Sequence, residues 1–510
     1  MLTRLPLRSP LLPVLALCAG PAAAQHAEIG DHRLDTELQP LVGASNLSFG
    51  ADVDVSGDLA LIGVAGDSTA GSFEGAVSVR SRNVGGPGAW GETMTLLPPD
   101  PSYNNGAFGG TVALSGNLAL VTSRQFEFDG FDGEVHFMNA STGALTATVR
   151  TTDPEINFFG RDTDTDGTTV IIGAERYVTG PPFQQFVGKA YLYDPTGVLQ
   201  LVLTPSDGAS NWAFATAVAV DGAYAVVGAY GADASQGAVY VYDTATGAEL
   251  YKLTASDGAA GDEFGRAVAI EGTRALIGAP RKGSNNIGGA YLFDLATGAE
   301  LTIYDDEGSA PAGAGVGWSV ALAGDRAYVG VPSSLGWVGF DQYVGRIYAF
   351  DLDYGYAVHW YDNPDSTDFN PSGMGWQLAA DGATMFDGNS GASGAVAGLI
   401  EGRAYTAERR DAGLGISVSS AGSLDPVTFT TRGGAPGGLV GTAVVAIDGV
   451  PVAPIPVPGS VGLLDGNGES VYPFVIPIGL AGTTTLTMQS LVTSKSGAFA
   501  FSNTRDLKIF

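Results

Sequence analysis

The stretch from Phe264 to Leu301 reads FGRAVAIEGTRALIGAPRKGSNNIGGAYLFDLATGAEL, and its pattern occurs seven times along the chain. Each copy opens on a Phe-Gly pair or a close variant, continues with an alternating strand and a Gly turn, and then gives an apolar run; in most copies a loop and a Gly-led aromatic strand follow. The copies begin at intervals of 50 to 59 residues, at Phe49-Gly50, Phe108-Gly109, Phe159-Gly160, Phe214-Ala215, Phe264-Gly265, Val316-Gly317 and Met374-Gly375. Such a period, made of strands alone, indicates blades around an axis, because one unit cannot bury its apolar face without neighbours.

The signature residues of this copy resemble those of the FG-GAP repeat family. Phe264-Gly265 is followed by Gly278-Ala279-Pro280 and then by Gly289-Ala290-Tyr291. The resemblance covers roughly three quarters of the chain. It implies the seven-bladed propeller of integrin α-subunit heads and of many secreted bacterial proteins, and with it adhesion to a protein or a glycan. Integrin-type repeats also carry a calcium loop between the first two strands, whereas this chain has a tight turn there, as at Glu271-Gly272.

The sequence therefore predicts an all-β protein in which a seven-bladed β-propeller is followed by a small β-sandwich. The propeller is expected over residues 25–402. Its seventh unit ends at Glu401-Gly402 without an outer strand, so we expect the N-terminal segment 34–43 to supply that strand by pairing with the strand around Ala395 to Leu399. A charged linker is expected over residues 403–412. Seven short strands in residues 413–510 favour the β-sandwich, for which the sequence indicates no role.

The N-terminus is typical of an exported protein. Arg4 and Arg8 precede a short apolar segment and Ala22-Ala23-Ala24, which together predict a signal peptide over residues 1–24. Cys18, the single cysteine, lies inside this segment, so the mature chain has no disulfide. We expect a protein that is secreted or held at the cell surface or in the periplasm, without a membrane span and monomeric.

The charge balance excludes some classes of partner. The chain has 53 acidic and 24 basic residues and a net charge of −29. Nucleic acids and anionic membranes need a basic face, so we expect neither as a partner. The acidic surface is also what solubility in extracellular water favours.

Few residues suggest catalysis. The histidines are His26, His32, His136 and His359, and a lone histidine on a strand is more often packed or solvated than a base. No metalloprotease or serine-hydrolase motif is present. We therefore expect a non-enzymatic binding protein with no catalytic residue and no cofactor. Two alternatives remain open: a polysaccharide hydrolase or lyase acting through acidic residues, and a structural module of an envelope or matrix.

The candidate metal ligands are Asp162, Asp164 and Asp166, in an Asp-x-Asp-x-Asp-Gly sequence that offers three hard oxygen ligands before a turn. The candidate ion is calcium. The alternative is an acidic patch facing the central channel, because Asp162 and Asp164 align with positions inside a strand of the fifth copy.

The candidate ligand-binding residues are aromatic side chains in the long loops between the second and third strands of copies two, three and six. They are Phe126, Phe128, Phe131, Tyr177, Phe183, Trp337 and Phe340. Aromatic rings on polar loops give large contact areas with few rotatable bonds, which favours a binding face for an extracellular protein or glycan. The alternative is that these rings fold back and cover the tops of the blades.

Overall fold

The computed structural model describes the propeller as a set of strands and the turns that join many of them. The described residues are 36–38, 48–65, 75–86, 89–100, 107–124, 133–153, 158–175, 188–208, 213–283, 285–305, 313–332, 345–352, 357–362, 374–382, 384–389 and 403–408, together with the strands between 413 and 509. The chain divides into two compact units, with His32–Arg410 in one and Asp411–Phe510 in the other.

Seven four-stranded antiparallel sheets form the first unit, and in each of the first six the strands follow one another in chain order from the inner to the outer edge. Blade one consists of β2 (Phe49–Ser56), β3 (Leu59–Val64), β4 (Ala76–Arg82) and β5 (Trp90–Leu96). Blade two consists of β6 (Val112–Ser115), β7 (Leu118–Arg124), β8 (Gly133–Asn139) and β9 (Leu145–Val149). Blade three consists of β10 (Phe158–Thr165), β11 (Val170–Glu175), β12 (Lys189–Tyr193) and β13 (Leu199–Leu203).

The next three blades repeat this plan. Blade four consists of β14 (Phe214–Asp221), β15 (Tyr224–Ala229), β16 (Ala238–Asp243) and β17 (Glu249–Leu253), with a short helical turn α1 (Ala232–Ser235) between β15 and β16. Blade five consists of β18 (Ala267–Glu271), β19 (Arg274–Ala279), β20 (Gly289–Asp294) and β21 (Ala299–Tyr304). Blade six consists of β22 (Val320–Ala323), β23 (Arg326–Val331), β24 (Arg346–Asp351) and β25 (Ala357–Asp362).

Blade seven joins the two ends of the propeller. Its strands are β26 (Gln377–Asp381), β27 (Thr384–Asn389), β28 (Arg403–Glu408) and, at the outer edge, β1 (Thr36–Leu38). The outer strand therefore comes from the N-terminal segment, and Leu38 pairs with Ala404. The third strand differs from the expectation: it is not the segment around Ala395 to Leu399 but Arg403–Glu408, within the stretch predicted as a linker. Segment 395–399 lies outside the described residues.

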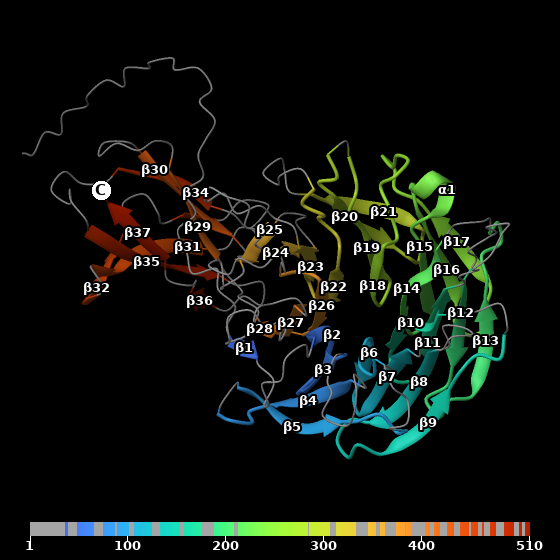
Figure 1. Ribbon diagram of the computed structural model, residues 1–510. Coiled ribbons are helices and arrows are strands. Elements are labelled where there is room, and N and C mark those ends of the chain that lie inside the picture. Colours follow the sequence, from blue (N-terminus) through green and yellow to red (C-terminus); the bar gives the residue numbers. More distant parts are fainter. Residues whose placement is uncertain are drawn as a thin grey trace, which may run out of the picture. The chain divides into compact units, whose positions relative to one another are not determined.

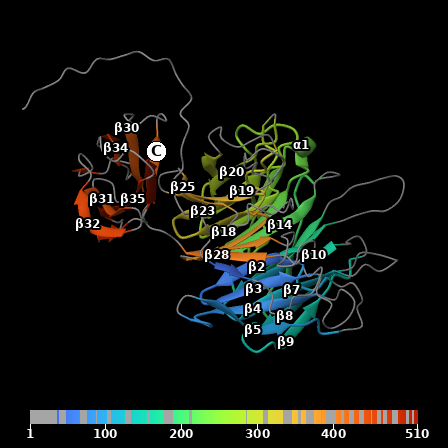
Figure 2. The same ribbon diagram turned by 60° about the vertical axis from the view of Figure 1, so that its left-hand side comes forward.

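The seven inner strands close a ring. Each of β2, β6, β10, β14, β18, β22 and β26 contacts the inner strands of both neighbouring blades, and β26 contacts β2. Figures 1 and 2 show the sheets arranged around this ring from two directions. The prediction of an all-β, seven-bladed propeller is confirmed.

The spacing of the signature residues follows from backbone contact between successive blades. A Cβ atom on Gly278 would lie 1.9 Å from the carbonyl oxygen of Gly317 in blade six, so only glycine fits there. Gly317 itself has a φ of +86°, which disfavours any other residue. The glycine of the second strand and the glycine of the next Phe-Gly pair are thus two halves of one contact.

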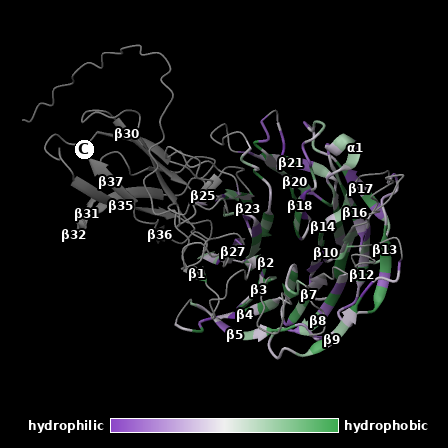
Figure 3. Cartoon of the chain, in the orientation of Figure 1, coloured by the Kyte–Doolittle hydropathy of each residue, from purple (hydrophilic) through white to green (hydrophobic). Residues whose placement is uncertain are grey.

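The aromatic anchors fill the spaces between blades. Phe264 is fully buried, and its ring lies edge-on to Tyr291 with 5.3 Å between ring centroids. It belongs to a cluster that combines side chains of blades four and five, including Val241 and Ile277. In Figure 3 the strands of this region carry apolar colouring while polar residues concentrate in turns and loops. Each blade therefore buries its apolar face only against a neighbour.

The second unit contains nine described strands in two sheets. They are β29 (Gly413–Val418), β30 (Pro426–Arg432), β31 (Leu439–Ile447), β32 (Val450–Pro456), β33 (Gly462–Leu463), β34 (Ser470–Val475), β35 (Thr484–Thr493), β36 (Phe499–Phe501) and β37 (Arg505–Ile509). One sheet has the order β29-β30-β34, and the other is built on β32-β31-β35-β36, with β33 beside β31 and β37 beside β35. Packing of the two sheets as a sandwich stays a prediction.

Candidate functional site

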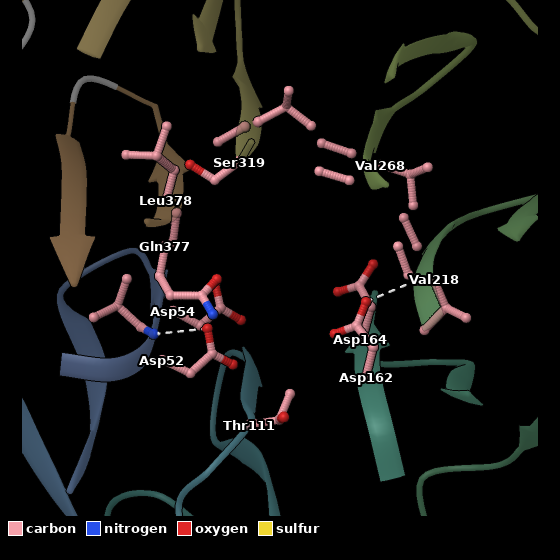
Figure 4. A pocket seen from close by; sticks show the side chains of 18 of the residues that line it. Asp52, Asp54, Thr111, Asp162, Asp164, Val218, Val268, Ser319, Gln377 and Leu378 are labelled. Carbon is pink, nitrogen blue, oxygen red and sulfur yellow. Dashed lines mark hydrogen bonds between the residues drawn. The ribbon is translucent and has the colours of Figure 1, made fainter. Parts of the chain in front are cut away.

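A cavity of about 490 Å³ follows the axis of the propeller. The inner strands and the residues just before them line it, so all seven blades converge on one site. Figure 4 shows Asp52 and Asp54 of blade one on one side of this cavity and Asp162 and Asp164 of blade three on the other. A volume of this size is in the range of small-ligand sites.

The aspartates of blade three connect two blades. Asp162 accepts the N–H of Val218 at 2.8 Å, and Asp164 accepts the N–H of Val220 at 2.8 Å. Asp166 continues the series by accepting the N–H of Gly222 at 2.9 Å. The three carboxylates therefore bind every second N–H of the inner strand of blade four, which is the edge of its sheet.

Blade one makes the same connection to blade two. Asp52 and Asp54 accept the N–H groups of Val112 and Leu114 at 2.8 and 2.6 Å, and the Ser56 hydroxyl accepts that of Gly116 at 3.0 Å. The Asp-x-Asp pattern on an inner strand is thus a device for joining neighbouring sheets.

Three of the other blade boundaries keep one such bond each, at the turn that follows the inner strand. Asp221 accepts the N–H of Gly272, Glu271 that of Gly324 and Asp381 that of Gly57, at 2.6, 3.0 and 2.6 Å. These turn acids hold successive blades together on the side of the ring opposite the Phe-Gly pairs.

Burial changes the acidity of the inner aspartates. It raises the pKa of Asp164 to about 6, although N–H groups of Val220 and Thr165 oppose the shift. Burial also raises the pKa of Asp54 well above its ordinary value, and the charge of Asp164 adds to that rise. Asp166 differs: burial acts to raise its pKa, but hydrogen bonds from Thr169, Thr168 and Gly222 outweigh burial and lower it.

The three aspartates predicted to bind calcium accept backbone N–H groups of the next blade. Each of Asp162 and Asp164 uses one oxygen for the next blade and the other for the N–H of its own following residue. In the described part of the chain, no group of three or more His, Cys, Asp or Glu side chains has an arrangement that could hold a metal ion. The geometry favours the alternative of acidic residues that line the channel.

The mouth of the channel carries a row of aromatic and cationic side chains. The guanidinium of Arg266 lies 5.0 Å from the ring centroid of Tyr230 and 5.0 Å from that of Trp318. The ring of Trp318 in turn meets that of Trp376 edge to face, with centroids 4.8 Å apart and an interplanar angle of 77°. The row crosses blades four to seven, and Arg161 of blade three also lines the cavity.

Sequence reasoning did not single out this row, although the repeat contains the signal. Arg161, Arg266, Trp318 and Trp376 each directly follow the Phe-Gly pair or its variant. The same position holds Ala51, Gly110 and Thr216 in the other blades. Comparing this one position across the copies would have identified a rim of unequal side chains.

The channel mouth lies at the end of the propeller that carries the connections between second and third strands. In blade five, Ala267 near the start of β18 pairs with Gly278 near the end of β19, so the connection to β20 begins beside Arg266. The aromatic residues predicted to bind a ligand occupy such connections, and all of them lie outside the described residues: Phe126, Phe128, Phe131, Tyr177, Phe183, Trp337 and Phe340.

His136 is a packed side chain of blade two. Its Nε2 and Nδ1 atoms contact the hydroxyls of Ser123 and Thr148 at 3.0 and 2.9 Å. Burial, with a contribution from Arg150, lowers the pKa of this histidine to about 4. His359 lies on β25, and its side chain is outside the described residues.

Comparison with known proteins agrees with the fold. The family model described as FG-GAP repeat matches residues 198–242 and 248–293, which cover parts of blades three, four and five. A search of curated proteins finds no match. The two matched segments are FG-GAP repeats, and together with the seven-bladed ring they support an FG-GAP-type propeller. Within the described residues, no helix has the length and apolar character needed to cross a membrane.

Proposed function

We propose that the protein is an exported, non-enzymatic binding propeller that recognises an extracellular glycan or protein at the channel mouth and the surrounding loops. The observation that carries the proposal is the Arg266–Trp318–Trp376 row, because it places a cation and indole rings in the lining of a cavity where all seven blades meet. Pockets of this kind combine apolar contact area with a few polar groups that orient a ligand.

The setting of the row supports a binding role over a purely structural one. Trp376 is 37% exposed, whereas the anchors that stabilise the blades, such as Phe264, are fully buried. A large indole that remains exposed contributes less to folding than a buried one. The exposed part of Trp376 is thus available to a ligand, whereas the buried anchors are not.

Export and the C-terminal unit belong to the same proposal. The predicted signal peptide over residues 1–24 would send the protein out of the cytoplasm. Without its single cysteine, which lies in this segment, the mature protein would fold without forming a disulfide. The two sheets of residues 413–509 would form the β-sandwich, as an attachment or spacer domain.

One observation favours a second candidate, a hydrolase acting on polysaccharide. Asp54 and Asp164 line the cavity from different blades, and both have a raised pKa because they are buried. A raised pKa is typical of carboxylic acids that act as general acids. Against this, both oxygens of each carboxylate accept backbone N–H groups, which supports the role of these aspartates in joining blades.

The test is a glycan and protein array probed with the mature protein and with two double variants. We expect capture of a defined set of ligands, and Trp318→Ser with Trp376→Ser should abolish it without a large loss of thermal stability. Phe128→Ser with Trp337→Ser should weaken it if the neighbouring loops also contact the ligand. Release of reducing sugar ends from captured glycans would instead favour the hydrolase, and failure to capture any ligand would contradict the proposal.

A further inference from the structure

Among the described residues, Arg266 has no acidic partner, whereas several other cations of the chain form ion pairs. In the same blade, Arg281 pairs with Glu263 at 3.2 Å and Lys282 with Asp257 at 3.0 Å. In a chain with 53 acidic and 24 basic residues, pairing is what charge composition alone would favour. The positive charge of Arg266 is therefore not neutralised by any described neighbour.

Two aromatic rings hold this guanidinium instead. It lies over the rings of Tyr230 and Trp318, 5.0 Å from each centroid. Contact of this kind positions a cation and leaves its N–H donors free to bind an anion. Because Arg266 already lies over the ring of Trp318, a cationic ligand would meet repulsion there, whereas an anion would meet attraction.

Trp376 provides an apolar surface next to this charge. Its indole is 37% exposed and makes an edge-to-face contact with Trp318. A rigid indole offers the C–H groups of a sugar ring a large contact area at little cost in side-chain entropy.

The described carboxylates that line the same cavity form no ion pair with Arg266. Asp52 and Asp162 use their oxygens for backbone N–H groups of their own and the next blade. The cavity of about 490 Å³ thus combines a guanidinium without an ion pair among the described residues, an exposed indole, and carboxylates that are hydrogen-bonded to backbone N–H groups.

We propose that the channel mouth binds a sugar acid, with the ligand carboxylate on Arg266 and the pyranose ring against Trp376. The inference rests on the proposed function and narrows its ligand to an acidic glycan. Carboxylate and guanidinium match in geometry and form charge-assisted hydrogen bonds, which supply the selectivity for acidic over neutral sugars.

The experiment compares one ligand in two charge states. Binding of trigalacturonate and of its fully methyl-esterified form is measured by isothermal titration calorimetry with the full mature chain. We expect the acid to bind and the ester to bind at least about tenfold more weakly. The ester has no negative charge, and its oxygens are weaker hydrogen-bond acceptors for the guanidinium of Arg266. Raised salt should weaken binding of the acid and leave that of the ester nearly unchanged.

Three variants separate the roles of the residues. Arg266→Gln should lower the affinity for the acid about tenfold and bring it close to that for the ester. Arg266→Lys keeps the charge without the planar fork and should give an intermediate affinity. Arg281→Gln, which removes an equal charge from an ion-paired side chain of the same blade, is the matched control and should bind like the wild type. Melting temperatures show that each variant is folded.

The outcomes distinguish this inference from the proposed function. Equal affinity for acid and ester, or unchanged affinity in Arg266→Gln, overturns the sugar-acid assignment while capture on the array still supports a binding propeller. No binding of either trisaccharide also overturns it. An empty array, in contrast, contradicts the proposed function itself.

Discussion

The carboxylate of Asp164 in blade three accepts the backbone N–H of Val220 in blade four at 2.8 Å. These two residues lie on inner strands that belong to separate sheets and share no backbone ladder. Each inner strand is a sheet edge whose unpaired N–H groups need acceptors, because an unsatisfied buried amide is costly. On blades one and three, acidic side chains at alternate positions of the inner strand supply these acceptors to the next blade, and they join the blades at the same time.

The first prediction concerns this bond. Asp164→Ala leaves the N–H groups of Val220 and Thr165 without their acceptor, so we expect a loss of about 1–3 kcal/mol in the free energy of unfolding. Asp194→Ala is the control. Asp194 accepts hydrogen bonds from the backbone N–H groups of an exposed turn and from the Gln200 side chain, so a smaller loss is expected. Urea unfolding at neutral pH measures both. Equal losses would show that the hydrogen bond between the blades contributes no more to the free energy of unfolding than bonds within a surface turn.

The second prediction is a pH dependence. The pKa of Asp164 is about 6 in the folded protein and close to 3.9 when unfolded, so the folded state takes up the proton first as pH falls. Its contribution to stability is therefore fully present below about pH 4 and lost as pH rises through about 6. The free energy of unfolding of wild type minus that of Asp164→Asn should rise by about 1–3 kcal/mol between pH 7 and pH 4.

The difference between the two proteins is what isolates Asp164. Burial lowers the pKa of His136 to about 4, so this histidine makes the folded protein less stable as pH falls from 7 to 4. Asp54, whose pKa is raised, makes it more stable over the same range, as Asp164 does. His136 is present in wild type and variant, so its effect largely cancels. The part of the Asp54 shift that comes from the charge of Asp164 is lost in the variant, and this adds to the expected difference in the same direction. A flat difference from pH 7 to pH 4 would contradict a raised pKa at Asp164.

The third prediction separates a bond between blades from a metal site. Because Asp162, Asp164 and Asp166 bind amides of the next blade, calcium should leave the melting temperature of the wild type nearly unchanged. Differential scanning calorimetry with calcium and with a chelator tests this. A strong rise with calcium that disappears in the triple Asp→Ala variant would restore the calcium interpretation.

Much of the fold could be predicted from the repeat, because the Phe-Gly pairs and the later glycines recur at the positions where the backbones of successive blades approach each other closely. Blade seven shows the limit. Its third strand reads RAYTAE, and the charged ends of this segment favour a linker by composition. In the structure Tyr405 is 1% exposed and Arg403 is 8% exposed, so the strand packs inside the blade. Burial of a charged residue depends on its tertiary partners, which local composition does not show.

The site was harder to predict than the fold for a related reason. Arg266, Trp318 and Trp376 are separated by more than fifty residues at each step, and they meet only because the ring closes. The sequence favoured the aromatic-rich loops as the binding site, because there several aromatic residues occur within a short segment. A position that varies among otherwise similar repeats was the more useful guide to the lining of the channel.

The last prediction concerns closure of the ring. Leu38 on β1 is 4% exposed and packs in a cluster that contains Phe49 and Trp90 of blade one and Phe386 of blade seven. One side chain of the N-terminal strand thus stabilises the boundary where the two ends of the propeller meet. Leu38→Ala should lower the free energy of unfolding by about 2–3 kcal/mol, because it removes buried methyl groups at a place the backbone cannot easily refill.

Leu250→Ala is the matched control, since Leu250 occupies the outer strand of blade four but is 41% exposed, and little loss is expected there. Deletion of residues 26–43 removes β1 entirely and should expose the edge of β28, so thermal unfolding should become less cooperative. Calorimetry of the three proteins decides the matter. If Leu38→Ala and the deletion both melt like the wild type, the N-terminal strand does not hold the ring closed, and the pairing of Leu38 with Ala404 contributes nothing to its stability.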